Sequence, residues 1–218
     1  MDIVSLYFRA VISAADIVGE SRCVMCGAKG SVFCPSHFSF FMEKSRRFSD
    51  EHWWFWHYDG KARDIILDIK RHKRFRLAYT LGVYVGQYLI KEDLVGLFHY
   101  VAYVPHHFTE FSKSMFSFPF FLALGISDVT SKPVVHLFNK LKPHSQHKLS
   151  AKERIKSLKN VYTINRSVSK VLDAILIVDD IITTGATLTT LKKLVERESK
   201  AQVYTITLAK TPKWSDVI

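Results

Sequence analysis

Apolar residues along this chain follow two alternating patterns. Four short runs rich in branched and aromatic residues are typical of buried strands, at 97–105, 132–139, 175–178 and 202–211. Elsewhere apolar residues recur every three or four positions, which predicts helices between Ile65 and Leu89 and over Leu188–Arg197. Strands that alternate with helices predict an α/β fold, a parallel sheet with helices on both faces.

The first 50 residues break this alternation, so we interpret 1–50 as a separate module and 51–218 as the main domain. Residues 1–18 predict an amphipathic helix, which contains Arg9 and Asp16 and is therefore unlike a signal peptide. The polar stretch at 44–50 marks the predicted boundary. No apolar run reaches the roughly 18 to 20 residues of a membrane-spanning helix, so we expect no transmembrane segment and a cytoplasmic protein.

All three cysteines lie in this first module. An odd number of cysteines in a chain expected in the cytoplasm argues against a disulfide framework. Cys23, Cys26, Cys34 and His37 follow a CxxC and a CxxH spacing, which supplies four ligands for one tetrahedral ion. We therefore predict a small zinc-binding domain whose site is structural, with no coordination position left for a substrate. The alternative is three free thiols beside an incidental histidine.

The stretch ILIVDDIITTGATL, at 175–188, carries the most specific chemistry. Its apolar run is expected to end at Asp179, where Asp180 adds a second carboxylate. Adjacent like charges are unfavourable unless hydroxyls or a cation meet them. A threonine-rich loop with Gly185 then leads into the predicted helix, whose unpaired N–H groups favour an anion. A ribose 5-phosphate carrying a magnesium-bound diphosphate offers all of these groups, whereas an ordinary strand, turn and helix needs no doubled aspartate.

This stretch closely resembles the ribose-phosphate loop of type I phosphoribosyltransferases. The resemblance implies that Asp179 and Asp180 contact the ribose hydroxyls. It also implies that the 5-phosphate is held by Thr183, Thr184, Gly185, Ala186 and Thr187. The expected ligand is phosphoribosyl diphosphate, or a related ribose phosphate, together with Mg²⁺.

The order of motifs from Cys23 onward resembles the ComF family over nearly the whole chain. The cysteine knuckle is followed by YDGKARDIILDIK, VAYVPHH, QHKLSAKERIKSLKNVY and then the ribose-phosphate loop. The matching positions are Tyr58, Gly60, Ile66, Lys70, Pro105, His107, Gln146, Leu149, Ser150, Glu153 and Arg154. The resemblance implies a phosphoribosyltransferase-like fold that handles single-stranded DNA entering the cytoplasm during natural transformation (competence), with other DNA-uptake proteins as further candidate partners.

One segment departs from the family pattern. Where ComF proteins usually carry an Arg-Gly-Phe-Asn-Gln run, residues 114–118 read SMFSF, so the arginine that would contact diphosphate is missing. In addition, Thr183 stands where purine-salvage transferases have an aspartate able to act as a general base. Both differences favour binding without transfer, and no catalytic residue is assigned. The alternatives are an active phosphoribosyltransferase of nucleotide metabolism and a zinc-dependent nucleic-acid binder with an inactive pocket.

A net charge of +11 favours polyanionic partners. The densest basic run, KRHKRFR, surrounds Phe75 with Lys70, Arg71, Lys73, Arg74 and Arg76. Cations that contact phosphates and aromatic rings that stack on bases are the means of binding single-stranded DNA. We predict that this run contacts DNA, with a solvated turn between two helices as the alternative. For Trp53, Trp54 and Trp56 we favour core packing over base stacking. A second basic cluster, at 140–159, could serve diphosphate or DNA.

Overall fold

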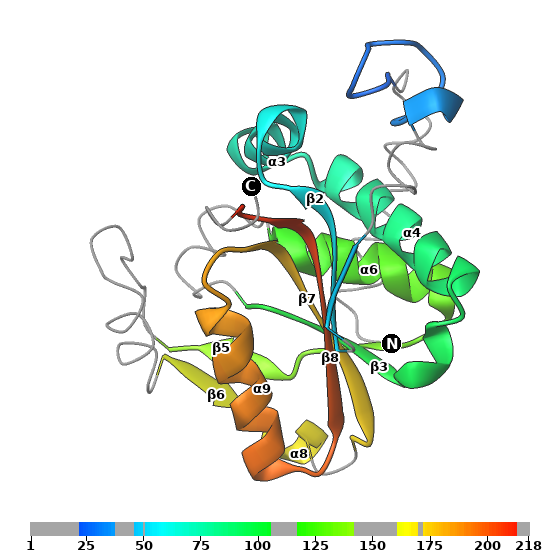
Figure 1. Cartoon of the computed structure of the whole chain (residues 1–218). Coiled ribbons are helices and arrows are strands. Elements are labelled where there is room, and N and C mark those ends of the chain that lie inside the picture. Colours follow the sequence, from blue (N-terminus) through cyan, green and yellow to red (C-terminus); the bar gives the residue numbers. More distant parts are fainter. Residues whose placement is uncertain are drawn as a thin grey trace.

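The computed structural model describes residues 22–37, 46–49, 51–105, 117–141, 161–169 and 172–212 (Figure 1). These residues form an α/β fold around a six-stranded sheet, in the order β1-β2-β8-β7-β3-β4. The strands are β1 (Arg46–Ser49), β2 (His52–His57), β3 (Tyr100–Tyr103), β4 (Val134–Val135), β7 (Ala174–Ile182) and β8 (Gln202–Lys210). Across the sheet, the neighbouring strands β2, β8, β7, β3 and β4 are parallel, and β1 pairs antiparallel with β2. A separate antiparallel pair consists of β5 (Phe138–Lys140) and β6 (Tyr162–Ile164).

Helices cover both faces of the sheet (Figure 1). The longer ones are α3 (Gly60–His72), α4 (Phe75–Lys91), α6 (Phe118–Thr130) and α9 (Ala186–Glu198), and the short ones are η1 (Val95–Leu97) and α8 (Arg166–Ser169). Alternate residues of β7 divide the core between the two faces: Leu176 packs in the cluster of α3, α4 and α6, and Ile177 packs in the cluster of α9. The prediction of an α/β fold with a parallel sheet is confirmed. Among the described helices, none is long and apolar enough to span a membrane.

Two features of the sheet were not predicted from the sequence. The tryptophan-rich segment forms β2, which the sequence pattern did not predict; Trp53, Trp54 and Trp56 are only 1%, 6% and 7% exposed, so the preference for core packing is confirmed. In addition, β1 lies inside the predicted polar boundary at 44–50 and yet pairs with β2. The sheet therefore begins before residue 51, because strand pairing depends on backbone groups that polar residues also carry.

Other expectations fall on residues outside the described ranges. These are the amphipathic helix at 1–18, residues 114–116 of the departing segment, and residues 142–159 of the second basic cluster. The same holds for the family positions His107, Gln146, Leu149, Ser150, Glu153 and Arg154.

Glycines allow α4 and α6 to pack at close range. A Cβ atom on Gly82 would lie 2.2 Å from the carbonyl oxygen of Leu122, and a Cβ atom on Gly125 would lie 2.2 Å from that of Tyr79. Both distances are far below van der Waals contact, and the clashing atoms belong to the backbone. The crossing therefore requires glycine at these two positions.

Gly125→Ala is expected to lower the free energy of unfolding by about 1 to 3 kcal/mol, because the added methyl group must push α4 and α6 apart. Urea denaturation would measure the change. Gly96→Ala is a matched control, since a Cβ atom at Gly96 would meet no atom within 4 Å. Equal unfolding free energies for the two variants would contradict the close crossing.

Candidate functional site

Cys23, Cys26, Cys34 and His37 lie close enough together to hold one metal ion. Their ligand atoms are all within 4.8 Å of one another. His37 Nδ1 lies 3.4 Å from Cys23 Sγ and 3.2 Å from Cys34 Sγ, and Cys26 Sγ lies 3.9 Å from Cys34 Sγ. Three sulfurs and one imidazole nitrogen are a donor set of structural zinc sites, so these residues fit zinc.

Backbone N–H groups around Cys23 favour the thiolate form of its side chain. Gly27 takes a positive φ of 78° and donates its N–H to the Cys23 carbonyl at 2.7 Å, which closes the turn. Burial raises the pKa of the Cys23 thiol, but backbone N–H groups of Cys34, Met25 and Cys26 outweigh it and lower the pKa to about 6. Cys23 is therefore mostly thiolate at neutral pH, the form that binds metal.

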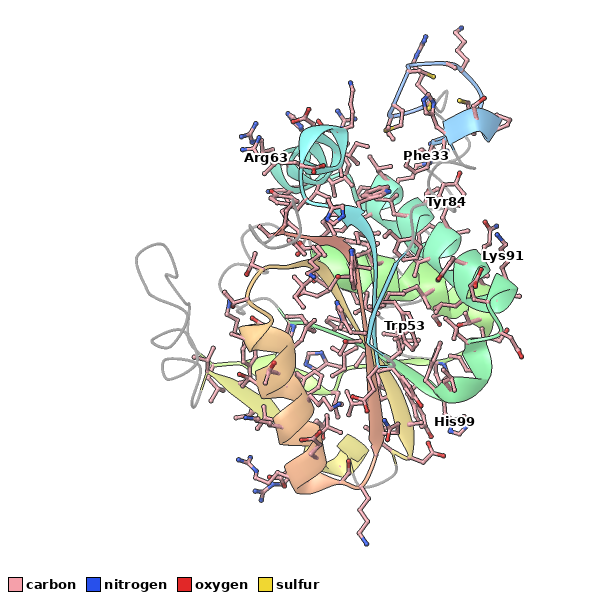
Figure 2. All side chains as sticks on the ribbon, in the orientation of Figure 1. Phe33, Trp53, Arg63, Tyr84, Lys91 and His99 are labelled. Atoms are coloured by element: carbon pink, nitrogen blue, oxygen red, sulfur yellow. The ribbon has the colours of Figure 1, made fainter. Side chains whose placement is uncertain are left out.

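Phe33 connects this cluster to the main domain. Its side chain is 4% exposed and packs in the same core as β2 and α4. The Phe33 ring centroid lies 5.5 Å from that of Tyr84 in α4 and 6.4 Å from that of Trp56 in β2. Figure 2 shows Phe33 beside Tyr84. The packing of Phe33 against β2 and α4 therefore helps to hold in place the segment that carries the Cys/His cluster.

The two aspartates lie at the carboxyl end of β7, but the strand does not end at Asp179 as predicted. Parallel pairing with β8 continues through Ile181 opposite Ala209 and Ile182 opposite Lys210. These pairings satisfy backbone hydrogen bonds that a loop would leave open. Asp179 and Asp180 therefore project from the last part of a central strand.

The loop after β7 is also shorter than predicted. Gly185 has a φ of 74°, as its place in the motif led us to expect, and α9 begins at Ala186. Ala186 and Thr187, predicted as loop residues, thus form the first turn of the helix. Thr183 and Thr184 are exposed beside it, and Thr184 Oγ1 accepts a long hydrogen bond of 3.4 Å from the Ala186 N–H. The first N–H groups of a helix lack intrahelical acceptors and are suited to an anion.

Lys70 reaches this edge of the sheet from the last turn of α3. Its Nζ lies 2.6 Å from Asp180 Oδ2, and the Asp180 N–H donates to Asp179 Oδ1 at 2.9 Å. Burial and then the neighbouring charge of Asp180 raise the pKa of Asp179 well above its usual range. Burial opposes protonation of Lys70, but the charges of Asp180 and Asp179 outweigh it and raise the pKa of the ammonium group.

The remaining cations of the basic run lie at the junction of α3 and α4. Arg71, Lys73 and Arg74 are exposed, whereas Arg76 is half-buried in α4. Lys73 ends α3 with a left-handed φ of 51°, and Arg74 Nε lies 2.6 Å from Asp68 Oδ2. The run therefore spans the end of α3, a short turn and the start of α4, with Lys70 paired to Asp180 and Arg74 paired to Asp68.

A pocket of about 260 Å³ adjoins the threonine loop between α9, β8 and the start of β2. Its lining residues are Glu51, His52, Ile182, Thr183, Thr184, Gly185, Leu188, Thr189, Lys192, Val203, Thr205 and Lys210. Asp179 and Asp180 are not among these residues, so the acidic pair is not part of the pocket lining.

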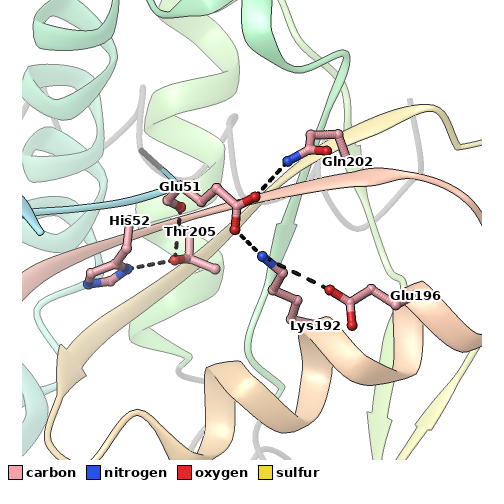
Figure 3. A network of polar contacts seen from close by, with 6 residues as sticks. All are labelled: Glu51, His52, Lys192, Glu196, Gln202 and Thr205. Atoms are coloured by element: carbon pink, nitrogen blue, oxygen red, sulfur yellow. Dashed lines mark hydrogen bonds and ion pairs between the residues drawn. The ribbon is translucent and has the colours of Figure 1, made fainter. Parts of the chain in front are cut away.

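Several residues that line this pocket take part in a network of polar contacts (Figure 3). The Glu51 carboxylate accepts hydrogen bonds from Lys192 and, at 2.9 Å, from Gln202. The hydrogen bond from Lys192 lowers the pKa of Glu51. His52 Nδ1 lies 2.6 Å from Thr205 Oγ1, and burial followed by the charge of Lys210 lowers the pKa of His52 to about 4. His52 is therefore neutral at pH 7.

Sequence patterns did not identify this network. His52 and Thr205 become neighbours only because β2 pairs with β8, where they are opposite each other in register. Their separation along the chain gives no local motif.

No protein-family model matches the chain, and a search of curated proteins gives no match either.

Proposed function

We propose that the carboxyl end of β7 and the start of α9 bind phosphoribosyl diphosphate with Mg²⁺, in a phosphoribosyltransferase-like domain of the ComF type. The observation that carries this proposal is the succession of Asp179, Asp180, the Thr183–Gly185 loop and the α9 N-terminus at one edge of a parallel sheet. Ligands of such sheets bind at the carboxyl ends of the strands.

In this proposal each group of the ligand has a partner in the chain. The carboxylates of Asp179 and Asp180 accept hydrogen bonds from the ribose hydroxyls. The N–H groups of Ala186 and Thr187 and the loop hydroxyls donate to the 5-phosphate. Mg²⁺ would neutralise the diphosphate, and Zn²⁺ would fill the Cys/His cluster as a structural ion.

Thr183 bears on whether transfer chemistry follows binding. Its hydroxyl cannot take the role of a general base at neutral pH. This supports a binding protein over the alternative of an active phosphoribosyltransferase. Turnover of phosphoribosyl diphosphate with a nucleobase acceptor would favour the alternative.

Calorimetric titration of the zinc-loaded protein with phosphoribosyl diphosphate and Mg²⁺ tests the proposal. Thr187→Ala is expected to weaken binding by about 1 to 3 kcal/mol, because a hydrogen bond to a charged phosphate is removed. Thr190→Ala is the control, since the Thr190 hydroxyl donates to the Ala186 carbonyl within α9 at 2.7 Å. A wild-type protein that shows no binding, or equal affinities of the two variants, would count against the phosphate cradle.

A second function is supported by the exposed cations at the α3–α4 junction. We propose that Arg71, Lys73 and Arg74 contact phosphates of single-stranded DNA, and that the protein handles incoming DNA in the cytoplasm during natural transformation, with other uptake proteins. The net charge of +11 adds to the attraction. The buried tryptophans of β2 leave base stacking to other side chains.

Arg71→Ala combined with Lys73→Ala is expected to flatten the salt dependence of single-stranded DNA binding. The slope of log K against log salt should fall by roughly 0.7 for each phosphate that the variant no longer neutralises. Fluorescence anisotropy with a labelled oligonucleotide at several salt concentrations would measure it. Lys193→Ala, an exposed lysine of α9, is the control. An unchanged slope would mean that the basic run is only a solvated turn.

A further inference from the structure

Lys70 differs from the rest of the basic run in what surrounds its ammonium group. The group lies 2.6 Å from a carboxylate oxygen of Asp180, a residue that is only 8% exposed. Asp179 is the preceding residue and adds a second carboxyl group. The carboxyl end of β7 thus has a cation of the protein itself against its acidic pair.

A ligand at this edge must compete with that cation. While the ion pair persists, the ammonium group uses one lone pair of Asp180 Oδ2, and its positive charge repels a divalent cation from the same carboxylate. The Lys70 side chain is 38% exposed and extends from the last turn of α3. Its flexible four-carbon stem allows the ammonium group to leave Asp180 without a change in the helix.

We infer that Lys70 is an internal counter-ion of this site: it occupies the cation position beside Asp180 when no ligand is bound and withdraws when a metal-bearing ligand enters. This inference rests on the proposed function, because it takes the acidic pair to be part of the phosphoribosyl site. Lys70 therefore regulates the affinity of the acidic pair for a metal-bearing ligand. We assign it this role instead of a contact with DNA.

Binding of Mn²⁺ alone tests the inference without a phosphoribosyl ligand. Electron paramagnetic resonance measures the concentration of free Mn²⁺ and so gives the affinity. The protein is loaded with zinc beforehand, so that Zn²⁺, which prefers thiolate ligands, already fills the Cys/His cluster. Lys70→Met is expected to bind Mn²⁺ about tenfold more tightly than the wild type, because a competing charge is removed from Asp180. Lys70→Arg keeps the charge and should retain the weak wild-type affinity.

Lys91→Met is the matched control for a general change in net charge, since Lys91 is an exposed lysine in the last turn of α4. Lys70→Gln replaces Lys70→Met if the latter loses cooperative thermal unfolding. Unchanged Mn²⁺ affinity in the neutral Lys70 variant, or an equal gain in Lys91→Met, would overturn the inference. Failure of the wild type to bind phosphoribosyl diphosphate would instead refute the proposed function, so the two results are distinguishable.

Discussion

Phosphoribosyl diphosphate with Mg²⁺ is expected to bind on the order of a hundredfold or more weakly when Asp179→Asn and Asp180→Asn are combined. An amide oxygen is a weaker acceptor than a carboxylate, and each hydrogen bond to a charged group contributes about 1.5 to 3 kcal/mol. Two such losses together correspond to about 3 to 6 kcal/mol of binding free energy, which calorimetry would detect as a greatly weakened or absent binding isotherm. The fold should persist, because asparagine keeps the shape of aspartate and relieves the repulsion within the pair. Lys70 loses its ion pair with Asp180, but its partly exposed side chain can place the ammonium group in water.

Asp173→Asn provides the control for this experiment. Asp173 precedes the first residue of β7, at the opposite end of the strand, and its carboxylate lies 2.7 Å from His99 Nδ1. The control should bind the ligand as the wild type does. Wild-type affinity in the double variant, with thermal unfolding unchanged, would remove the aspartates from the ligand site and with them the centre of the proposed function.

Metal loss is expected to have the largest effect on stability. The purified protein should contain about one Zn²⁺ per chain, and Cys26→Ser should lower the free energy of unfolding by several kcal/mol, because metal binding and folding of such a knuckle are coupled. The effect should extend to the sheet, since Phe33 packs between the knuckle and Trp56. Elemental analysis would give the metal content. Urea denaturation monitored by tryptophan fluorescence would give the free energy of unfolding.

Ser36→Ala serves as the matched control, because Ser36 is exposed and adjoins His37 without offering a thiolate. It should retain both metal and stability. A Cys26→Ser protein that is free of metal and melts at the wild-type temperature would show that the Cys/His cluster does not stabilise the fold.

Local signals in the sequence are sufficient for the parts of the site that are continuous in the chain. The apolar run before Asp179, the glycine at 185 and the helical repeat after it each depend on neighbouring residues, and the structure has a strand, a positive φ and a helix there. The error is one of extent: β7 continues to Ile182 because β8 supplies pairing partners, which no local pattern encodes.

Lys70 and His52 illustrate what local patterns miss. The sequence groups Lys70 with its basic neighbours, but its position in the last turn of α3 directs it to Asp180 on a distant strand. His52 begins a strand whose aromatic residues are buried throughout and therefore lack the alternation that identifies a strand. In both cases the decisive neighbour is brought near only by the tertiary fold.

The pairing of β1 with β2 has a consequence for truncated forms of this protein. A chain that begins at residue 51, at the boundary the sequence suggests, would lack both β1 and Phe33. The outer backbone groups of β2 would then be open along a strand rich in tryptophan, and exposed strands of this kind pair with other chains. Such a fragment should aggregate, so the main domain is best isolated together with the segment that precedes it.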